Sequence, residues 1–317
     1  MEKFTNAFKK PTIEFIGGFL MIAVFVAPFL IFASSRNDIY VDGSKSGVED
    51  GSVSRPYHTI SEALVHANDR SDVHVAKGTY EDNIEIPSGV KIFGTSADEV
   101  VIQAKSHRKV VVSMKSNTEI NKVTIKDGHE GIWIKKNAKA SIIDCVIKNN
   151  EKDGIKIESG STKKNSAINI TDSIIKDNGR SGIFSQKHRL VIMNNEITNN
   201  DSDGISMVAG SSAWIEKNTI KGNNGSGISA TLDNSDIWTK SNTYRSNGHS
   251  GIEINAYGGT GRIDVNKSKF INNDKYAIAR ISRGNVSASI WNGLTSQKNN
   301  TFDQTKQGNI SSILRIN

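Results

Sequence analysis

The chain has 317 residues, with 40 Lys and Arg against 33 Asp and Glu and a formal net charge of +7 at pH 7. A single cysteine excludes an intrachain disulfide, and so excludes the small secreted folds that disulfides hold together. The sequence contains neither a run of five basic residues nor an aromatic–basic stripe, so we expect no nucleic-acid partner. A basic surface outside the cytoplasm suits an acidic polysaccharide or another cell-envelope glycan, although an ordinary solvated surface remains an alternative.

The N-terminal residues include a long apolar segment that follows three lysines. Residues 13–33 form an almost wholly apolar run of the length that a transmembrane helix needs, which is about 20 residues. This run is longer than the apolar core of most signal peptides. Small residues at 33–35 would suit a signal peptidase, so a cleaved signal peptide stays open beside an uncleaved anchor. In both cases the lysines predict a cytoplasmic segment 1–12 and an extracytoplasmic remainder, either held by a single membrane pass or secreted.

Residues 38–109 contain short apolar runs of the kind that form strands. Between two of these runs, Thr59 and Glu62 form a capping box that predicts a short helix over 59–67.

Residues 110–317 repeat themselves. A Gly-Ile pair returns every 22 to 28 residues, which predicts a solenoid. The glycines of the six pairs are Gly131, Gly154, Gly182, Gly204, Gly227 and Gly251. Isoleucine at alternate positions after each glycine is typical of strands rather than helices.

Two further positions recur in each unit and predict the turns. Three residues after the second apolar pair stands an asparagine, whose amide can bond to the amide of the next coil. The asparagines are Asn150, Asn178, Asn200, Asn223, Asn247 and Asn273. The only cysteine, Cys145, shares a second column with small polar residues, so we expect it to be packed rather than reactive.

These repeats and the preceding segment resemble the right-handed parallel β-helix of the pectin-lyase-like superfamily. The resemblance covers residues 38–317 and implies an all-β, single-stranded solenoid of about ten coils, in one domain, with an N-terminal segment 38–109 and repeats 110–317. It also implies that the helix at 59–67 caps the first coil, which protects the sheet edges there from unwanted pairing.

The residues just before the Gly-Ile pairs suggest a site. Stacked parallel strands lie about 4.8 Å apart, so one repeat position forms a column with that spacing. Three members of this column, Glu130, Asp153 and Asp203, are carboxylates and are the catalytic candidates. Ordinary turn chemistry also favours Asp and Ser before glycine, so a purely structural role is the alternative.

Cationic and aromatic residues lie beside those carboxylates in the first complete coils. We expect Lys156 and Arg180 to contact a uronate carboxylate, and Trp133 and Phe184 to contact sugar rings. The histidines lack the spacing of a metal site, so no metal site is predicted.

The resemblance leaves several functions open. One is a surface protein that binds or processes acidic polysaccharide; a second is a lyase, epimerase or glycoside hydrolase; a third is a non-catalytic structural or adhesion solenoid. The sequence establishes no cofactor; the resemblance makes Ca²⁺ held by acidic side chains the candidate cofactor for the lyase alternative alone. Ser202-Asp203-Gly204 is similar to a polygalacturonase motif, but the chain lacks the Asp-Asp and Arg-Ile-Lys motifs of that group, which argues against hydrolysis of that type.

Overall fold

The computed structural model describes residues 36–163, 166–284 and 286–315. The predicted cytoplasmic segment 1–12 and the predicted anchor 13–33 lie outside these ranges. Among the described residues, no helix has the length and apolar character that crossing a membrane requires.

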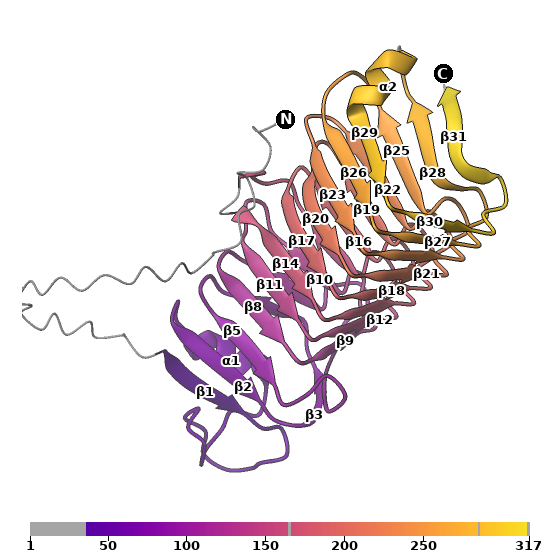
Figure 1. Ribbon diagram of the computed structural model, residues 1–317. Helices are drawn as coiled ribbons and strands as arrows, with labels where there is room; N and C mark the ends of the chain where they lie inside the picture. Colours follow the sequence, from indigo (N-terminus) through magenta and orange to yellow (C-terminus); the bar gives the residue numbers. More distant parts are fainter. Residues whose placement is uncertain (1–35, 164–165, 285, 316–317) are drawn as a thin grey trace, which may run out of the picture. The chain divides into compact units, whose positions relative to one another are not determined.

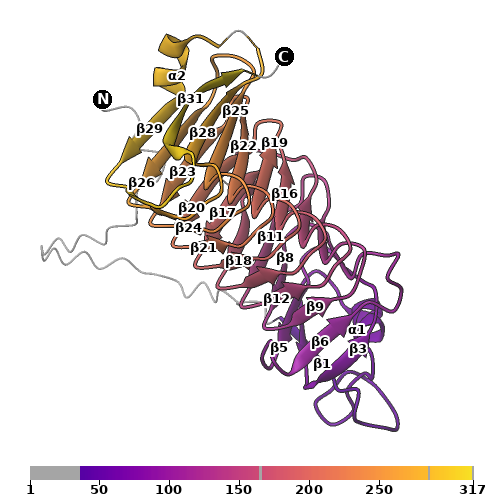
Figure 2. The same ribbon diagram turned by 90° about the vertical axis from the view of Figure 1, so that its right-hand side faces the viewer.

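The described residues wind into three parallel sheets that run along the stack of coils (Figures 1 and 2). Sheet A consists of β1 (Asn37–Val41), β2 (Ser71–Val75), β5 (Lys91–Gly94), β8 (Thr118–Asn121), β11 (Ala140–Ile143), β14 (Ile168–Thr171), β17 (Arg189–Met193), β20 (Ser212–Glu216), β23 (Asp236–Lys240), β26 (Arg262–Asn266) and β29 (Thr295–Lys298). Sheet B consists of β3 (Gly78–Glu81), β6 (Val100–Gln103), β9 (Thr124–Lys126), β12 (Val146–Lys148), β15 (Ile174–Lys176), β18 (Glu196–Thr198), β21 (Thr219–Lys221), β24 (Thr243–Arg245), β27 (Lys269–Ile271) and β30 (Thr301–Asp303).

Sheet C contains the strands that follow the Gly-Ile pairs. It consists of β4 (Ile84–Ile86), β7 (Val112–Met114), β10 (Ile132–Ile134), β13 (Ile155–Ile157), β16 (Ile183–Gln186), β19 (Ile205–Val208), β22 (Ile228–Leu232), β25 (Ile252–Ala256), β28 (Tyr276–Ser282) and β31 (Gly308–Arg315). Its strands lengthen from three residues in β4 to eight in β31. The predicted right-handed parallel β-helix is confirmed.

Alternation within the strands builds the core. In β10, Ile132 and Ile134 are fully buried while Trp133 lies on the outer face, and Ile132 pairs in register with Ile155 of the next coil. The glycine before each strand is required by close packing of coils: a Cβ on Gly204 would lie 2.7 Å from the Gly227 carbonyl oxygen. In the Gly-Ile repeat, the isoleucine therefore fills the core, and the glycine allows neighbouring coils to pack closely.

The asparagine column forms the predicted ladder at the turns between sheets B and C. Each amide nitrogen donates to the amide oxygen of the next coil over 2.9–3.1 Å, from Asn150 through to Asn273. The Cys145 column is also buried and bonded, and Asn195 Nδ2 donates to Asn218 Oδ1 at 3.0 Å. We call the Asn150–Asn273 column the asparagine ladder.

The two ends of the stack differ from its middle. Helix α1 (Ile60–His66) contacts β1, β2 and β4, and its capping box at Thr59 is present as predicted. Toward the C-terminus, stacked rings of Tyr244, Phe270 and Phe302 take the core column that isoleucine fills in earlier coils. Helix α2 (Ala288–Leu294) contacts β26 and β29 and buries Trp291.

Candidate functional site

The column that precedes the Gly-Ile pairs bonds one coil to the next. Asp153 Oδ1 accepts the Ser181 backbone N–H at 3.1 Å, and Asp203 Oδ1 accepts that of Ser226 at 2.8 Å. We call this column, which comprises Glu130, Asp153, Ser181, Asp203, Ser226 and Ser250, the acid–serine column. Two of the three predicted catalytic carboxyls thus each use one oxygen to satisfy a backbone donor.

Glu130 differs from the other acids because its partners are side chains. It is buried, and its two oxygens bond to His129 Nδ1 at 2.7 Å and Lys156 Nζ at 3.2 Å. Burial opposes ionisation of this carboxyl, but the hydrogen bonds from His129 and Lys156 outweigh it and hold the pKa of Glu130 below its ordinary value. Glu130 is therefore an ionised partner for cations at neutral pH.

Asp153 lies on the next coil, where the charge of Glu130 affects its pKa. Burial raises its pKa above the ordinary value, while the positive charge of Arg180 and the Ser181 N–H offset part of that rise, and the charge of Glu130 adds to it. Arg180 itself is exposed. Glu130, Lys156 and Arg180 thus all act electrostatically on Asp153.

Asp203 belongs to a different set of neighbours. Burial raises its pKa to about 6; the Ser226 N–H and the Ser206 hydroxyl lower it, the charge of Glu253 raises it, and that of His249 lowers it. This carboxyl is the one that can hold a proton close to neutral pH. The three predicted catalytic acids are therefore divided between two groups along sheet C.

A groove of about 510 Å³ lies over the outer face of β4, β7, β10 and β13. Its lining residues are Asn83, Ile84, Glu85, Arg108, Lys109, Val110, Ser113, His129, Glu130, Trp133, Lys135 and Lys156. Of the three predicted catalytic acids only Glu130 contributes to this lining. Phe184 is half-buried one coil further along, in register with Lys156, and lies outside it. We call this feature the Trp133 groove.

The indole of Trp133 is covered by cations. Lys135 Nζ lies 3.9 Å and Lys156 Nζ 4.8 Å from the ring centroid, both within the range of cation–π attraction. A sugar ring can reach the predicted stacking position only by displacing a lysine. The Trp133 Nε1 donor is buried and has no hydrogen-bond partner within the described residues.

The groove carries more positive than negative charge. Glu85 pairs with Lys115 at 2.7 Å and Glu130 pairs with Lys156, so both groove carboxylates are neutralised. Within the described part of the chain, no ion pair joins Arg108, Lys109 or Lys135 to a carboxylate. The groove therefore presents three cations that are available to an anionic ligand.

Sequence reasoning missed the contribution of Arg108 and Lys109. They end the segment 38–109 and reach the groove because β7, which starts three residues after Lys109, lies beside β10. The basic triplet at 107–109 can be seen in the sequence. Only the pairing register of β7 with β10 shows that it lies near Trp133.

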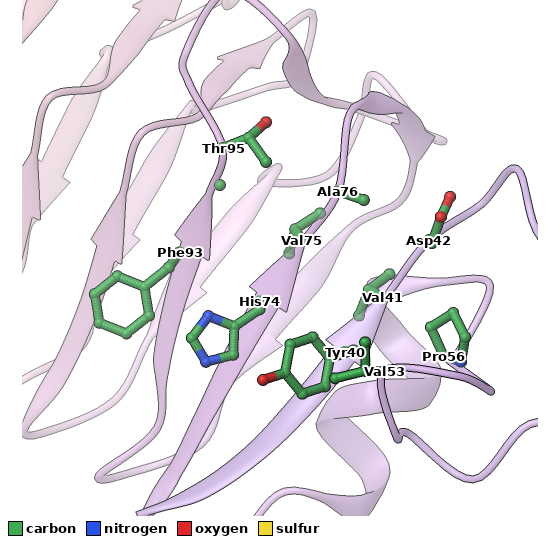
Figure 3. A pocket seen from close by; sticks show the side chains of 11 residues that line it. Tyr40, Val41, Asp42, Val53, Pro56, His74, Val75, Ala76, Phe93 and Thr95 are labelled. Atoms are coloured by element: carbon green, nitrogen blue, oxygen red, sulfur yellow. The ribbon is translucent and has the colours of Figure 1, made fainter.

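A row of stacked rings on sheet A was also missed. Tyr40, His74 and Phe93 occupy one outward position of β1, β2 and β5, with ring centroids 5.0 and 5.8 Å apart (Figure 3). They line a depression of about 360 Å³ beside Val53 and Pro56. The row could have been found in the sequence from the matched strand positions Ile39-Tyr40-Val41 and Val73-His74-Val75.

The donor atoms do not assemble a metal site. Among the described residues, no three His, Cys, Asp or Glu side chains come together as ligands. Cys145 is buried, and burial raises the pKa of its thiol to about 12, so it is not a thiolate ligand at neutral pH. Met114 and Met207 are buried in the core.

Solved structures share the fold at low sequence identity. The A-module of the mannuronan C-5 epimerase AlgE4 of Azotobacter vinelandii is 13% identical over 87% of this chain and 99% of its own, with a TM-score of 0.55. The pectate lyase Pel9A is 12% identical over 90% of this chain and 79% of its own, also at 0.55. The Dettilon tailspike protein is 15% identical over 88% of this chain and 62% of its own, at 0.54.

Curated proteins give no significant match to the sequence. A protein-family model does match: residues 88–310 fit the family described as periplasmic copper-binding protein, NosD. Among the described residues, no three His, Cys, Asp or Glu side chains converge as a copper site of imidazole and thiolate ligands would require. The match spans more than half of the sequence and almost all of the repeat region, and the chain therefore belongs to the NosD family.

Proposed function

We propose that this protein binds an acidic polysaccharide outside the cytoplasm, and that the Trp133 groove is the binding site. The observation that carries the proposal is the set of three cations, Arg108, Lys109 and Lys135, that line the groove together with Trp133 and have no carboxylate partner in the described structure. Uncompensated positive charge in a depression concentrates an anionic ligand and strengthens its attachment.

The groove chemistry suits a uronate unit. A carboxylate can accept hydrogen bonds from Arg108, Lys109 or Lys135, and charge-assisted hydrogen bonds of this type are the stronger ones in proteins. When Lys135, the nearer of the two lysines over the indole, turns toward such a carboxylate, it uncovers part of the Trp133 ring, which then becomes available to the apolar face of a pyranose. Ligand binding and exposure of the stacking surface are thus coupled in the proposal.

An extracytoplasmic location fits both the sequence and the family. The NosD family is described as periplasmic, and the lysines before residues 13–33 favour export of the chain beyond that segment. The names of two proteins of similar fold, a mannuronan epimerase and a pectate lyase, refer to polysaccharide substrates. Copper has no part in the proposal, because the described donor atoms do not converge.

Binding of a uronate oligosaccharide to the full chain tests the proposal directly. We expect Lys135→Gln to weaken binding about tenfold at low salt, since one available cation and its coupling to Trp133 are lost. Lys136→Gln is the matched control, because Lys136 is the exposed neighbouring residue and does not line the groove. Equal losses in both variants, or no binding to any acidic glycan, would leave the structural or adhesion solenoid as the better interpretation.

A second candidate, enzymatic turnover of the same glycan, is favoured by Asp203. Its pKa of about 6 suits a general acid, and Glu253 supplies a second carboxyl nearby. The Glu130–Asp153 pair is the other candidate. Incubation with pectate, alginate and hyaluronan, with and without Ca²⁺, would reveal lyase or epimerase activity and whether it depends on the cation. Loss of activity in Asp203→Ala but not in Glu130→Ala would assign the chemistry to the later coils.

A further inference from the structure

Sheet B carries a column of basic side chains on its outer face. The last residue of successive three-residue strands is basic in five of six consecutive coils, and the register pairs these residues directly. The members are Lys126, Lys148, Lys176, Lys221 and Arg245, with Thr198 between Lys176 and Lys221. We call this set the basic column.

The basic column contrasts with other outward columns of the solenoid. The column on sheet C that contains Trp133 continues through Lys156, Phe184 and Ser206, so its chemistry changes at each of these coils. Like charges placed directly opposite each other across neighbouring strands destabilise a sheet. The repulsion between the like charges of the basic column therefore destabilises the sheet when no ligand is bound.

Exposed acids partly relieve that penalty. Lys126 pairs with Asp127 at 3.2 Å, Lys176 with Asp177 at 3.6 Å and Lys221 with Glu196 at 2.8 Å. All six side chains are between 25% and 43% exposed, so these pairs are weak and can exchange partners. Across residues 36–163, 166–284 and 286–315, no ion pair joins Lys148 or Arg245 to a carboxylate.

We propose that the basic column binds a linear polyanion that lies along the stack of coils. The strand spacing places one residue of the column about every 4.8 Å, with a cation at every step except Thr198, and the five steps from Lys126 to Arg245 span about 24 Å. A flexible chain with an anionic group on each repeating unit, such as a uronate polysaccharide or a polymer linked through phosphates, matches this one-dimensional pattern. The column lies on sheet B and the Trp133 groove on sheet C, so this second surface does not depend on the function proposed for the groove.

Charge reversal at the two residues without acid partners tests the proposal. We expect Lys148→Glu with Arg245→Glu, in the full chain held in neutral-lipid nanodiscs, to weaken binding of polygalacturonate about tenfold or more at low salt. Lys139→Glu with Lys163→Glu is the matched control: it makes the same charge change at exposed residues in the segments between sheets C and A. Inorganic polyphosphate, used in a parallel arm, distinguishes phosphate from carboxylate polymers.

Two further measurements separate a binding surface from a general charge effect. Affinity should rise with ligand length until the ligand spans the six coils, and this dependence should disappear in the charge-reversed variant. Lys148→Arg with Arg245→Lys should retain binding, since charge and register are unchanged. Equal weakening in the control pair, or affinity that does not depend on length in the unmodified chain, would overturn the proposal. Lys135→Gln should leave the length dependence intact, so failure of the groove proposal is visible separately.

Discussion

The asparagine ladder and the acid–serine column lie three residues apart in each unit, and both bond one coil to the next. The ladder keeps asparagine in all six coils, because each member must donate to one coil and accept from another. The acid–serine column needs only an oxygen that accepts a backbone N–H, so Asp153, Asp203 and Ser226 all serve. Where the fold requires only an acceptor, the residue type is free to acquire other chemistry.

The largest effect is expected from a break in the ladder. Asn200→Ala removes the amide that donates to Asn223 and to the Ile175 carbonyl and that accepts from Asn178. Because these groups are buried and would be left unsatisfied, we expect a loss of about 3–5 kcal/mol in the free energy of unfolding, measured by denaturant titration. Asn224→Ala, at an exposed turn, should cost less than about 0.5 kcal/mol. Similar losses in both variants would show that the ladder is not special.

A substitution in the acid–serine column should increase the free energy of unfolding rather than decrease it. The pKa of Asp203 is raised to about 6 in the folded chain, so its ionisation destabilises the fold as the pH rises from about 4 through 6. Asp203→Asn keeps an acceptor for the Ser226 N–H and removes this penalty. We expect it to stabilise the protein by on the order of 2 kcal/mol at pH 8, with no gain below about pH 4. Melting at several pH values measures this, and a gain that is independent of pH would contradict the assigned cause.

Glu130 differs from the other members of the acid–serine column because its hydrogen-bond partners are side chains. Glu130→Gln removes the charge that neutralises Lys156 and raises the net positive charge of the groove. We expect binding of uronate oligosaccharides to become about threefold to tenfold tighter at low salt, with the difference shrinking as salt is added. Asp264→Asn, a loss of negative charge on sheet A, is the control and should leave binding unchanged. Weaker binding in Glu130→Gln would mean that the carboxylate contacts the ligand itself.

The smallest effect is expected at Cys145. The residue shares its column with Ser173 and Ser268, and its Sγ donates to the Ile143 carbonyl at 3.2 Å, a bond that a serine hydroxyl can make. We therefore expect Cys145→Ser to change the free energy of unfolding by less than about 1 kcal/mol, measured by denaturant titration. A loss as large as that of Asn200→Ala would show that the two turn columns are equally demanding.

The sequence predicts the fold well because each repeat position answers one physical requirement. Period-two isoleucines, glycine at the coil contacts and asparagine at the turns identify the strands, their register and the ladder, and the capping box identifies α1. The site was predicted less completely. Column spacing places Glu130, Asp153 and Asp203 on one edge of sheet C, but only Glu130 lines the groove. Asp203 precedes β19, beyond the coils that the groove covers, and the repeat pattern does not show where the groove ends.

Other parts of the site depend on contacts that no repeat pattern encodes. Lys135 lies over Trp133 because the two residues are two positions apart and so lie on the same face of the chain. From the sequence alone, the face of the Trp133 ring is expected to be free. Arg108 comes from the segment before the repeats and reaches the groove through the register of β7 with β10. Such residues become visible only when neighbouring coils are placed side by side.

The lengthening of the sheet C strands has a consequence for motion. The coils that carry the groove are held on this sheet by three-residue strands, whereas β22 and β25 have five residues and β28 has seven. Fewer backbone hydrogen bonds must break for a short rung to open, so local opening costs less there than near the C-terminus. Amide hydrogens of β10 and β13 should exchange with solvent faster than those of β25. The proposed binding groove thus lies over the coils that sheet C holds with its shortest strands, so a polymer that binds there would meet the part of this sheet that opens at the lowest cost.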